Sequence, residues 1–144
     1  MLLMTIISAL AVPRFAGFLA EQRLDAAGRR IVTDIALAKR HSKHNSAALP
    51  VTFGSVSDTY TVSGLSDPDH PTASYVVRLG EEPYGVDIVS ADFGGDAELR
   101  FDGYGTPDSG GTVVLRVGTR TRTVSVEAGS GTPKVIGVGQ PGAN

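Results

Sequence analysis

The sequence has 144 residues, of which 41% are hydrophobic and 19% are charged, and its formal net charge is −2. This composition is that of an ordinary folded chain, and the length suits one domain with an appendage. Cysteine is absent, which excludes a disulfide framework, thiolate zinc sites and thiol catalysis.

Charge is distributed unevenly along the chain. Residues 1–45 carry seven basic and three acidic side chains, whereas residues 46–144 carry six basic and twelve acidic ones. The two parts therefore face different surroundings or each other.

The chain begins with an apolar run, MLLMTIISALAV, which is followed by a proline and then by charged sequence. The run has the length of a signal-peptide core with small residues at 9–11, but no basic residue precedes it. As a complete transmembrane span it is too short, unless residues 15–20 extend it and Arg14 reaches to the interface. A third interpretation is the lower half of a membrane helix that continues past Pro13, because proline is tolerated inside membrane helices.

Residues 24–38 predict an amphipathic helix. Its apolar side chains recur at steps of three and four residues, which places them on one face: Leu24, Ala27, Ile31, Ile35 and Ala38. The next proline is Pro50, so we expect the helix to run to about residue 45. Leu24, Ile31 and Ile35 are expected to pack against the rest of the domain.

Beyond residue 49 the apolar side chains repeat every second residue, which predicts strands. Six short segments rich in β-branched and aromatic residues are separated by Gly, Asp, Ser and Pro: 51–64, 73–80, 84–93, 97–105, 112–118 and 120–129. The last two flank GTR and predict a hairpin.

One helix followed by strands, with no alternation of the two, predicts an α+β fold in which a long N-terminal helix packs on an antiparallel sheet or sandwich. We expect three parts: a helix over 1–45, a β domain over 46–136 and a flexible glycine-rich tail over 137–144.

Several short patterns bear on ligand binding. His41 and His44 lie one helical turn apart, but no carboxylate accompanies them, so a solvated helix end explains them better than a metal site. DPDHP, from Asp67 to Pro71, places two carboxylates and an imidazole within five residues, as a metal site would, but a surface turn requires the same prolines and aspartates and explains them better. GVGQPG at 137–142 has no helix after it to receive a pyrophosphate. No catalytic motif is present, and we expect neither an enzyme nor a cofactor or metal site.

A basic stripe is the remaining candidate site, and it comprises Arg116, Arg120, Arg122 and Lys134. Arg120 and Arg122 share a strand face and could bind nucleic-acid phosphates with a steep salt dependence. The alternative is a strand edge that charge protects against aggregation, which the acidic remainder of the domain favours.

The segment MTIISALAVPRF, followed by a charged amphipathic helix and a β domain, resembles the type IV pilin and pseudopilin superfamily. The stretch LRFDGYGTPDSGGTVVLRVGTRTRTVSVEAGSGTPKV resembles the end of the minor-pilin group that contains the H-type pseudopilin of type II secretion and the DNA-uptake minor pilin FimT. Its shared features are a strand that ends in phenylalanine, a glycine-containing loop, a hairpin with a basic second strand and a closing glycine segment.

The resemblance implies a structural subunit of a secretion or pilus-like assembly. Its partners would be other pilins and the assembly platform of the bacterial inner membrane, with the β domain outside the cytoplasm. Pro13 would mark a kink, and the residues of the membrane and filament helix would be Leu2, Leu3, Ile6, Ile7, Leu10 and Pro13.

Two features of the family pattern are missing. The prepilin-peptidase glycine and phenylalanine, and the glutamate after them, would precede Met1, so we expect the true start to lie upstream. GSGTPKV stands where the family closes with glycine-arginine, which favours a secretion subunit over a DNA-binding one. A further alternative, an exported soluble β-domain binding module, predicts a mature start at Val12 and no membrane association.

Overall fold

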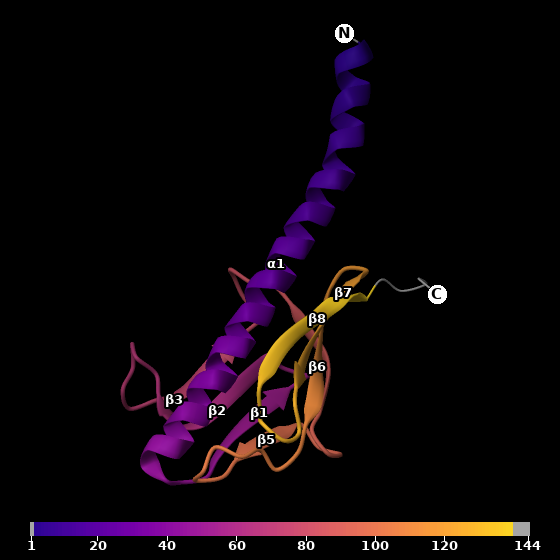
Figure 1. The fold of residues 1–144 in the computed structure, drawn as a ribbon. Helices are drawn as coiled ribbons and strands as arrows, with labels where there is room; N and C mark the ends of the chain where they lie inside the picture. Colours follow the sequence, from indigo (N-terminus) through magenta and orange to yellow (C-terminus); the bar gives the residue numbers. More distant parts are fainter. Residues whose placement is uncertain (1, 140–144) are drawn as a thin grey trace.

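The computed structural model describes the backbone of residues 2–139 and the side chains of residues 17–136. One helix, α1 (Leu2–Asn45), accounts for the N-terminal third of the chain. With a rise of about 1.5 Å per residue, its 44 residues span about 66 Å. Figure 1 shows that the lower part of α1 lies across the sheets and that its N-terminal part projects away from them.

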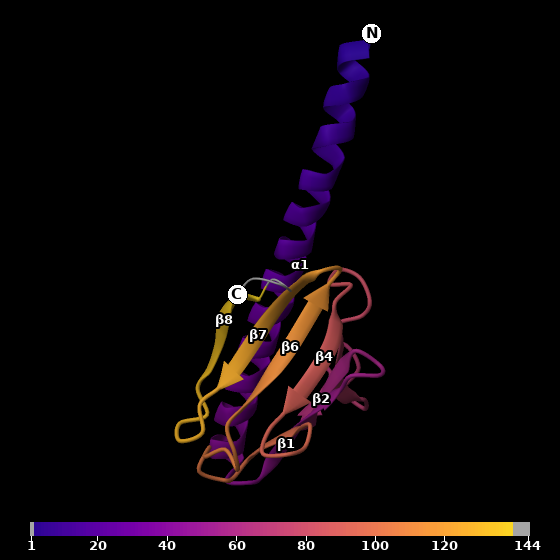
Figure 2. The same ribbon diagram turned by 90° about the vertical axis from the view of Figure 1, so that its right-hand side faces the viewer.

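Two four-stranded antiparallel sheets form the rest of the domain. The first has the order β3-β2-β1-β5 and contains β1 (Leu49–Gly54), β2 (Thr59–Ser66), β3 (Ser74–Arg78) and β5 (Glu98–Phe101). The second, which faces the viewer in Figure 2, has the order β4-β6-β7-β8. Its strands are β4 (Asp87–Asp92), β6 (Gly111–Val117), β7 (Arg120–Val126) and β8 (Pro133–Gly139).

The hydrophobic core lies between α1 and the inner faces of both sheets. Leu24, Ile31 and Ile35 of α1 have no exposed surface, and they belong to the same cluster as Val51 of β1 and Val124 of β7. Side chains alternate between the two faces of each strand, and those on the inner face complete this core. In β7, for example, every second residue from Arg122 onward is buried. A single core therefore joins the helix to both sheets.

The α+β fold predicted from the sequence is confirmed, and the hairpin predicted around GTR is β6–β7, with Val117 paired to Arg120. The segment 51–64 contains two strands, because the chain reverses at residues 55–58, where Asp58 adopts a φ of 53°. β8 was not predicted, since glycines interrupt its alternation, and it includes residues 137–139, which the sequence placed in the tail. Residues 140–144 lie outside the described part.

Candidate functional site: the projecting helix and its attachment

The apolar face of α1 is packed closely against the second sheet. Gly28 is buried there, and a Cβ atom at this position would lie 3.2 Å from Cγ2 of Val135 on β8. A side chain there would require Val135 to give way by a few tenths of an ångström, so the glycine permits the close approach of the two elements. The contact between Gly28 and Val135 therefore sets the distance between α1 and β8 at this point.

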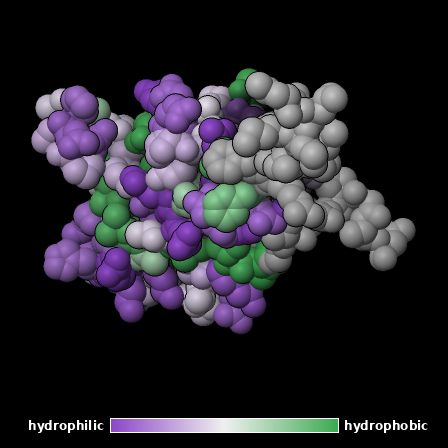
Figure 3. Space-filling view, turned by 90° about the horizontal axis from the view of Figure 1, so that it is seen from above, coloured by the Kyte–Doolittle hydropathy of each residue, from purple (hydrophilic) through white to green (hydrophobic). Residues whose placement is uncertain are grey.

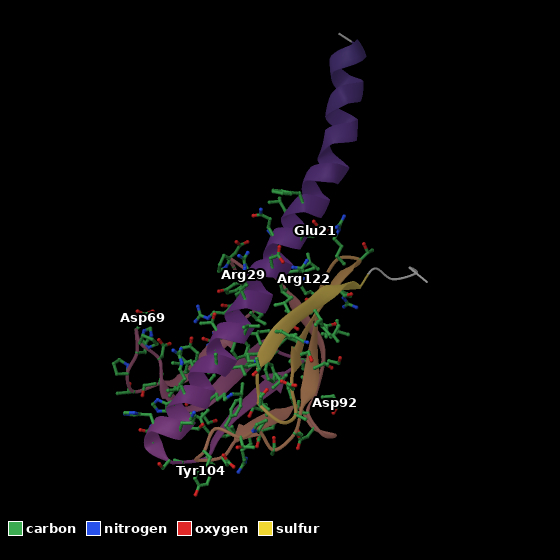
Figure 4. All side chains as sticks on the ribbon, viewed as in Figure 1. Glu21, Arg29, Asp69, Asp92, Tyr104 and Arg122 are labelled. Atoms are coloured by element: carbon green, nitrogen blue, oxygen red, sulfur yellow. The ribbon has the colours of Figure 1, made fainter. Side chains whose placement is uncertain are left out.

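Two ion pairs attach α1 to β7 just below the point where the helix leaves the domain. Arg120 binds Glu21, and Arg122 binds Asp25. Arg122 is only 8% exposed, and Figure 4 shows it between the helix and the second sheet. The Arg120 guanidinium also lies against the helix backbone, 2.9 Å from the position of a Cβ atom on Gly17. Both arginines therefore face the helix.

A buried carboxylate forms the lower attachment, between α1 and the first sheet. Asp34 is 3% exposed and accepts hydrogen bonds from the hydroxyl groups of Tyr60 on β2, at 2.5 Å, and Tyr75 on β3, at 3.0 Å. Nε of Arg30 donates to the same carboxylate at 3.0 Å, and its Nη2 donates to the Tyr75 hydroxyl at 2.7 Å. Both carboxylate oxygens thus have partners, which compensates for burying the charge.

Electrostatics in this cluster keep the tyrosines neutral and the arginine charged. Burial raises the pKa of Tyr60 far above its ordinary value, and the adjacent negative charge of Asp34 raises it further. The same two causes raise the pKa of Tyr75. Burial of Arg30 opposes its charge, but the hydrogen bond and the charge of Asp34 outweigh this and raise its pKa.

This cluster was missed in the sequence, although a signal for it exists. Asp34 follows Ile31 by three residues, so it lies on the apolar stripe of α1 instead of its polar face. A carboxylate in that place requires buried donors, and the two tyrosines of neighbouring strands supply them.

The part of α1 above the ion pairs has an exposed apolar surface. Phe18 is 55% exposed and Leu19 is 40% exposed. Viewed from above, the described surface alternates hydrophobic and hydrophilic patches (Figure 3).

The helix is continuous through Pro13. The side chains predicted to enter a membrane or filament core lie outside the described side chains: Leu2, Leu3, Ile6, Ile7, Leu10 and Pro13.

In the part of the chain that the structure describes, no helix combines the length and the apolar character that crossing a membrane requires.

The predicted basic residues do not share one surface. Arg116 pairs with Thr121 across the hairpin, which places it on the face opposite Arg120 and Arg122. It lies 3.5 Å from Asp87, and both side chains are about half exposed. Lys134 is exposed on β8 opposite Ser125, also away from the helix. The four residues are therefore divided between the helix side and the outer side of the second sheet.

The other sequence candidates take part in local structure. Nε2 of His41 lies 2.7 Å from the side-chain Nδ2 of Asn45, one turn further along α1. Oδ1 of Asp67 accepts a hydrogen bond from the Asp69 amide at 2.8 Å, which closes a turn, and His70 lies 3.8 Å from the same carboxylate. Among the described residues, no group of three or more possible metal ligands is placed to hold an ion.

Neither a protein-family model nor a curated protein matches the sequence. Among solved structures, the chain is similar to the type IV minor pilin FimU of Pseudomonas aeruginosa, with a TM-score of 0.59 and 13% sequence identity. The match covers 81% of this chain and 90% of the chain in that structure. The long helix, the two antiparallel sheets and this likeness together show that the chain has a type IV pilin-like fold.

Proposed function

We propose that the chain is a structural minor pilin or pseudopilin subunit that assembles with other pilins through the projecting part of α1. One observation carries the proposal: the sheets bury the apolar face of α1 from Leu24 onward, whereas Phe18 and Leu19 above it are exposed. An apolar helix that continues beyond its own domain requires a second apolar environment.

That environment changes during assembly in the proposed mechanism. Before assembly the apolar run at 1–12 lies in the bacterial inner membrane, and afterwards it packs against the same segment of neighbouring subunits. The ion pairs of Arg120 and Arg122, and the buried Asp34 cluster, hold the lower helix in one orientation on the sheets. The β domain is thereby displayed outside the cytoplasm at a fixed angle to the projecting helix.

Cysteine cross-linking tests the proposal, because the natural chain has no cysteine. A Leu10→Cys variant labelled with benzophenone maleimide should, on irradiation in its native cells, form covalent adducts with other pilin-like proteins, identified by mass spectrometry, because the photoactivated ketone inserts into a C–H bond of any neighbour. Val56→Cys, at a fully exposed turn position, is the matched control and should form few. Recovery of the Leu10→Cys protein in the soluble fraction, without adducts, would overturn the proposal.

Mass spectrometry of the N-terminal peptide from native cells tests the exported-module alternative. A mature start at Val12 would support a cleaved export signal and a soluble binding module. A peptide that extends upstream of Met1 and begins with methylated phenylalanine would support the pilin-like subunit.

The pairing of Arg120 and Arg122 with Glu21 and Asp25 leads us to favour a structural subunit over a DNA-binding one. A gel-shift titration at two salt concentrations tests this choice. Salt-sensitive DNA binding that disappears in the Arg116→Ala, Lys134→Ala double variant would support DNA uptake instead.

A further inference from the structure

The outer edge of β3 has backbone groups without partners among the described residues. The Leu79 amide donates to the Asp58 carbonyl at 2.8 Å, so Arg78 and Thr59 face each other as a non-hydrogen-bonded pair. Alternation along the ladder then directs the backbone amides and carbonyls of Val76 and Arg78 away from β2. No hydrogen bond to these outward groups occurs within the described part of the chain.

The opposite edge of the same sheet is covered. On β5 the Arg100 carbonyl accepts from the Asp108 amide at 2.9 Å, and the Arg100 amide donates to the Asp108 carboxylate at 3.2 Å. The following loop therefore occupies the edge of β5. In the first sheet, the position for an added strand is beside β3.

A groove of about 320 Å³ runs along this edge. Residues 75–78 of β3 form one wall, and Arg30 of α1 contributes from the helix side. Residues 67–69 close one end, and Glu81, Glu82 and Tyr84 line the other. Because four consecutive strand residues line the groove, it has the shape for an extended segment of about four residues.

The charges that line the groove indicate which charge a bound segment would carry. Asp67, Asp69, Glu81 and Glu82 contribute four carboxylates to its lining. The lining includes two arginines, but Arg30 already pairs with the buried Asp34, at 3.0 Å. Arg78 therefore stands against four acidic side chains, and the groove is complementary to a positively charged segment.

We propose that the free edge of β3 binds an extended, positively charged segment of a partner protein, which adds a fifth strand to the first sheet. Main-chain hydrogen bonds to Val76 and Arg78 would supply affinity, and the acidic groove ends would select lysine or arginine. This site lies on the β domain, apart from the projecting helix, so it goes beyond the proposed function and does not depend on it.

A peptide titration with the full chain in detergent tests the proposal. The probe is the fluorescein-labelled peptide KTVTVTK, with ETVTVTE as its charge-reversed control, and fluorescence polarisation is the readout. We expect the basic peptide to bind at least tenfold more tightly than the acidic one and to weaken as salt is raised.

Two sets of variants separate backbone pairing from charge. Val76→Pro removes an amide that points away from β2, so no hydrogen bond to β2 is lost, and proline is tolerated at such edge positions. This variant should bind the basic peptide at least tenfold more weakly. Val76→Thr keeps the amide and should bind within twofold of the natural chain. Glu81→Gln with Glu82→Gln, both exposed, should weaken binding and reduce its salt dependence.

Equal binding of the two peptides, or full binding by Val76→Pro with an unchanged melting temperature, would overturn the proposal. If Val76→Pro lowers the melting temperature, the glutamine double variant decides, and unchanged binding by it would also overturn the proposal. Self-association of the natural chain that Val76→Pro abolishes would assign the edge to a second copy instead of a partner protein.

Discussion

The hydroxyl oxygen of Tyr60 on β2 lies 2.5 Å from Oδ2 of Asp34 on α1, and both residues are buried. A hydrogen bond to a charged group stabilises a fold by about 1.5–3 kcal/mol, more than a neutral one. Tyr75 and Arg30 bind the same carboxylate, so the rotation of α1 about its axis is linked to the first sheet. A helix held by apolar contacts alone would have less directional restraint.

Removal of the Tyr60 hydroxyl should therefore destabilise the domain. We expect Tyr60→Phe to lower the free energy of unfolding at pH 7 by about 1.5–3 kcal/mol, because one partner of a buried carboxylate is lost. Urea unfolding followed by circular dichroism measures the change. Tyr104→Phe is the control, since Tyr104 is 85% exposed, and a similar loss in both variants would contradict the role of the buried bond.

Stability should also fall at alkaline pH because of Tyr60. In the unfolded chain its hydroxyl titrates near pH 10, whereas burial and the charge of Asp34 raise its pKa in the folded protein. Above about pH 10 the folded state holds a proton that the unfolded state has lost, so stability is retained below this pH and falls above it. The contribution is up to about 1.4 kcal/mol per pH unit.

Urea unfolding between pH 8 and 11 measures this dependence. Tyr60→Phe should decrease the slope above pH 10, and Tyr104→Phe should leave it unchanged. A slope that is the same in the natural chain and in Tyr60→Phe would refute the prediction.

Periodicity in the sequence was sufficient to predict the class of fold and the buried stripe of α1, because apolar spacing reports directly which face is buried. It was insufficient for β8, which glycines interrupt and which is specified mainly by its pairing with β7. Pairing between distant segments depends on the tertiary structure, and local patterns carry little information about it.

The candidate site shows the same limit. Arg120 and Arg122 lie on one strand face, but the sequence did not show that this face meets Glu21 and Asp25. Arginines on a strand have the same local pattern whether they bind phosphates or a carboxylate of their own chain. Only the position of α1 across β7 distinguishes the two cases.

The Arg122–Asp25 pair should contribute more to stability than an exposed pair. Arg122 is 8% exposed, and its Nε has no hydrogen-bond partner among the described residues, so Asp25 compensates for most of its buried charge. Asp25→Asn should cost more than the about 0–1 kcal/mol of exposed pairs and less than the about 3–5 kcal/mol of fully buried ones, because Asp25 is half-exposed.

The matched control is Asp87→Asn, which breaks the exposed pair with Arg116. Urea unfolding of both variants gives the comparison. Equal free energies of unfolding in Asp25→Asn and Asp87→Asn would show that burial of Arg122 adds nothing to its ion pair.

Ile31 should be essential for attachment of α1 to the sheets. Its side chain is fully buried in the core, and Ile31→Ala should cost about 2–5 kcal/mol through lost burial and the cavity left behind. Ile31→Asp should cost more, since it buries a carboxylate without a donor. Thr33→Ala, on the exposed face of the same helix, is the control. A melting temperature unchanged by Ile31→Asp would show that this face is not packed on the sheets.

Gly111, the first residue of β6, should tolerate no side chain. A Cβ atom there would lie 2.0 Å from the carbonyl oxygen of Asp92 and 2.6 Å from Cδ1 of Phe93. Because the nearer atom belongs to the backbone of β4, relief requires β4 and β6 to separate. We expect Gly111→Ala to cost at least about 1–3 kcal/mol, the usual cost of overpacking.

Gly129→Ala is the matched control, since a Cβ atom at Gly129 meets nothing within 4 Å, and it should change stability by less than about 0.5 kcal/mol. Thermal unfolding of the two variants checks the prediction. Equal melting temperatures would mean that β4 and β6 can separate at this end without loss, and that their pairing at Asp92 and Thr112 contributes little to the second sheet.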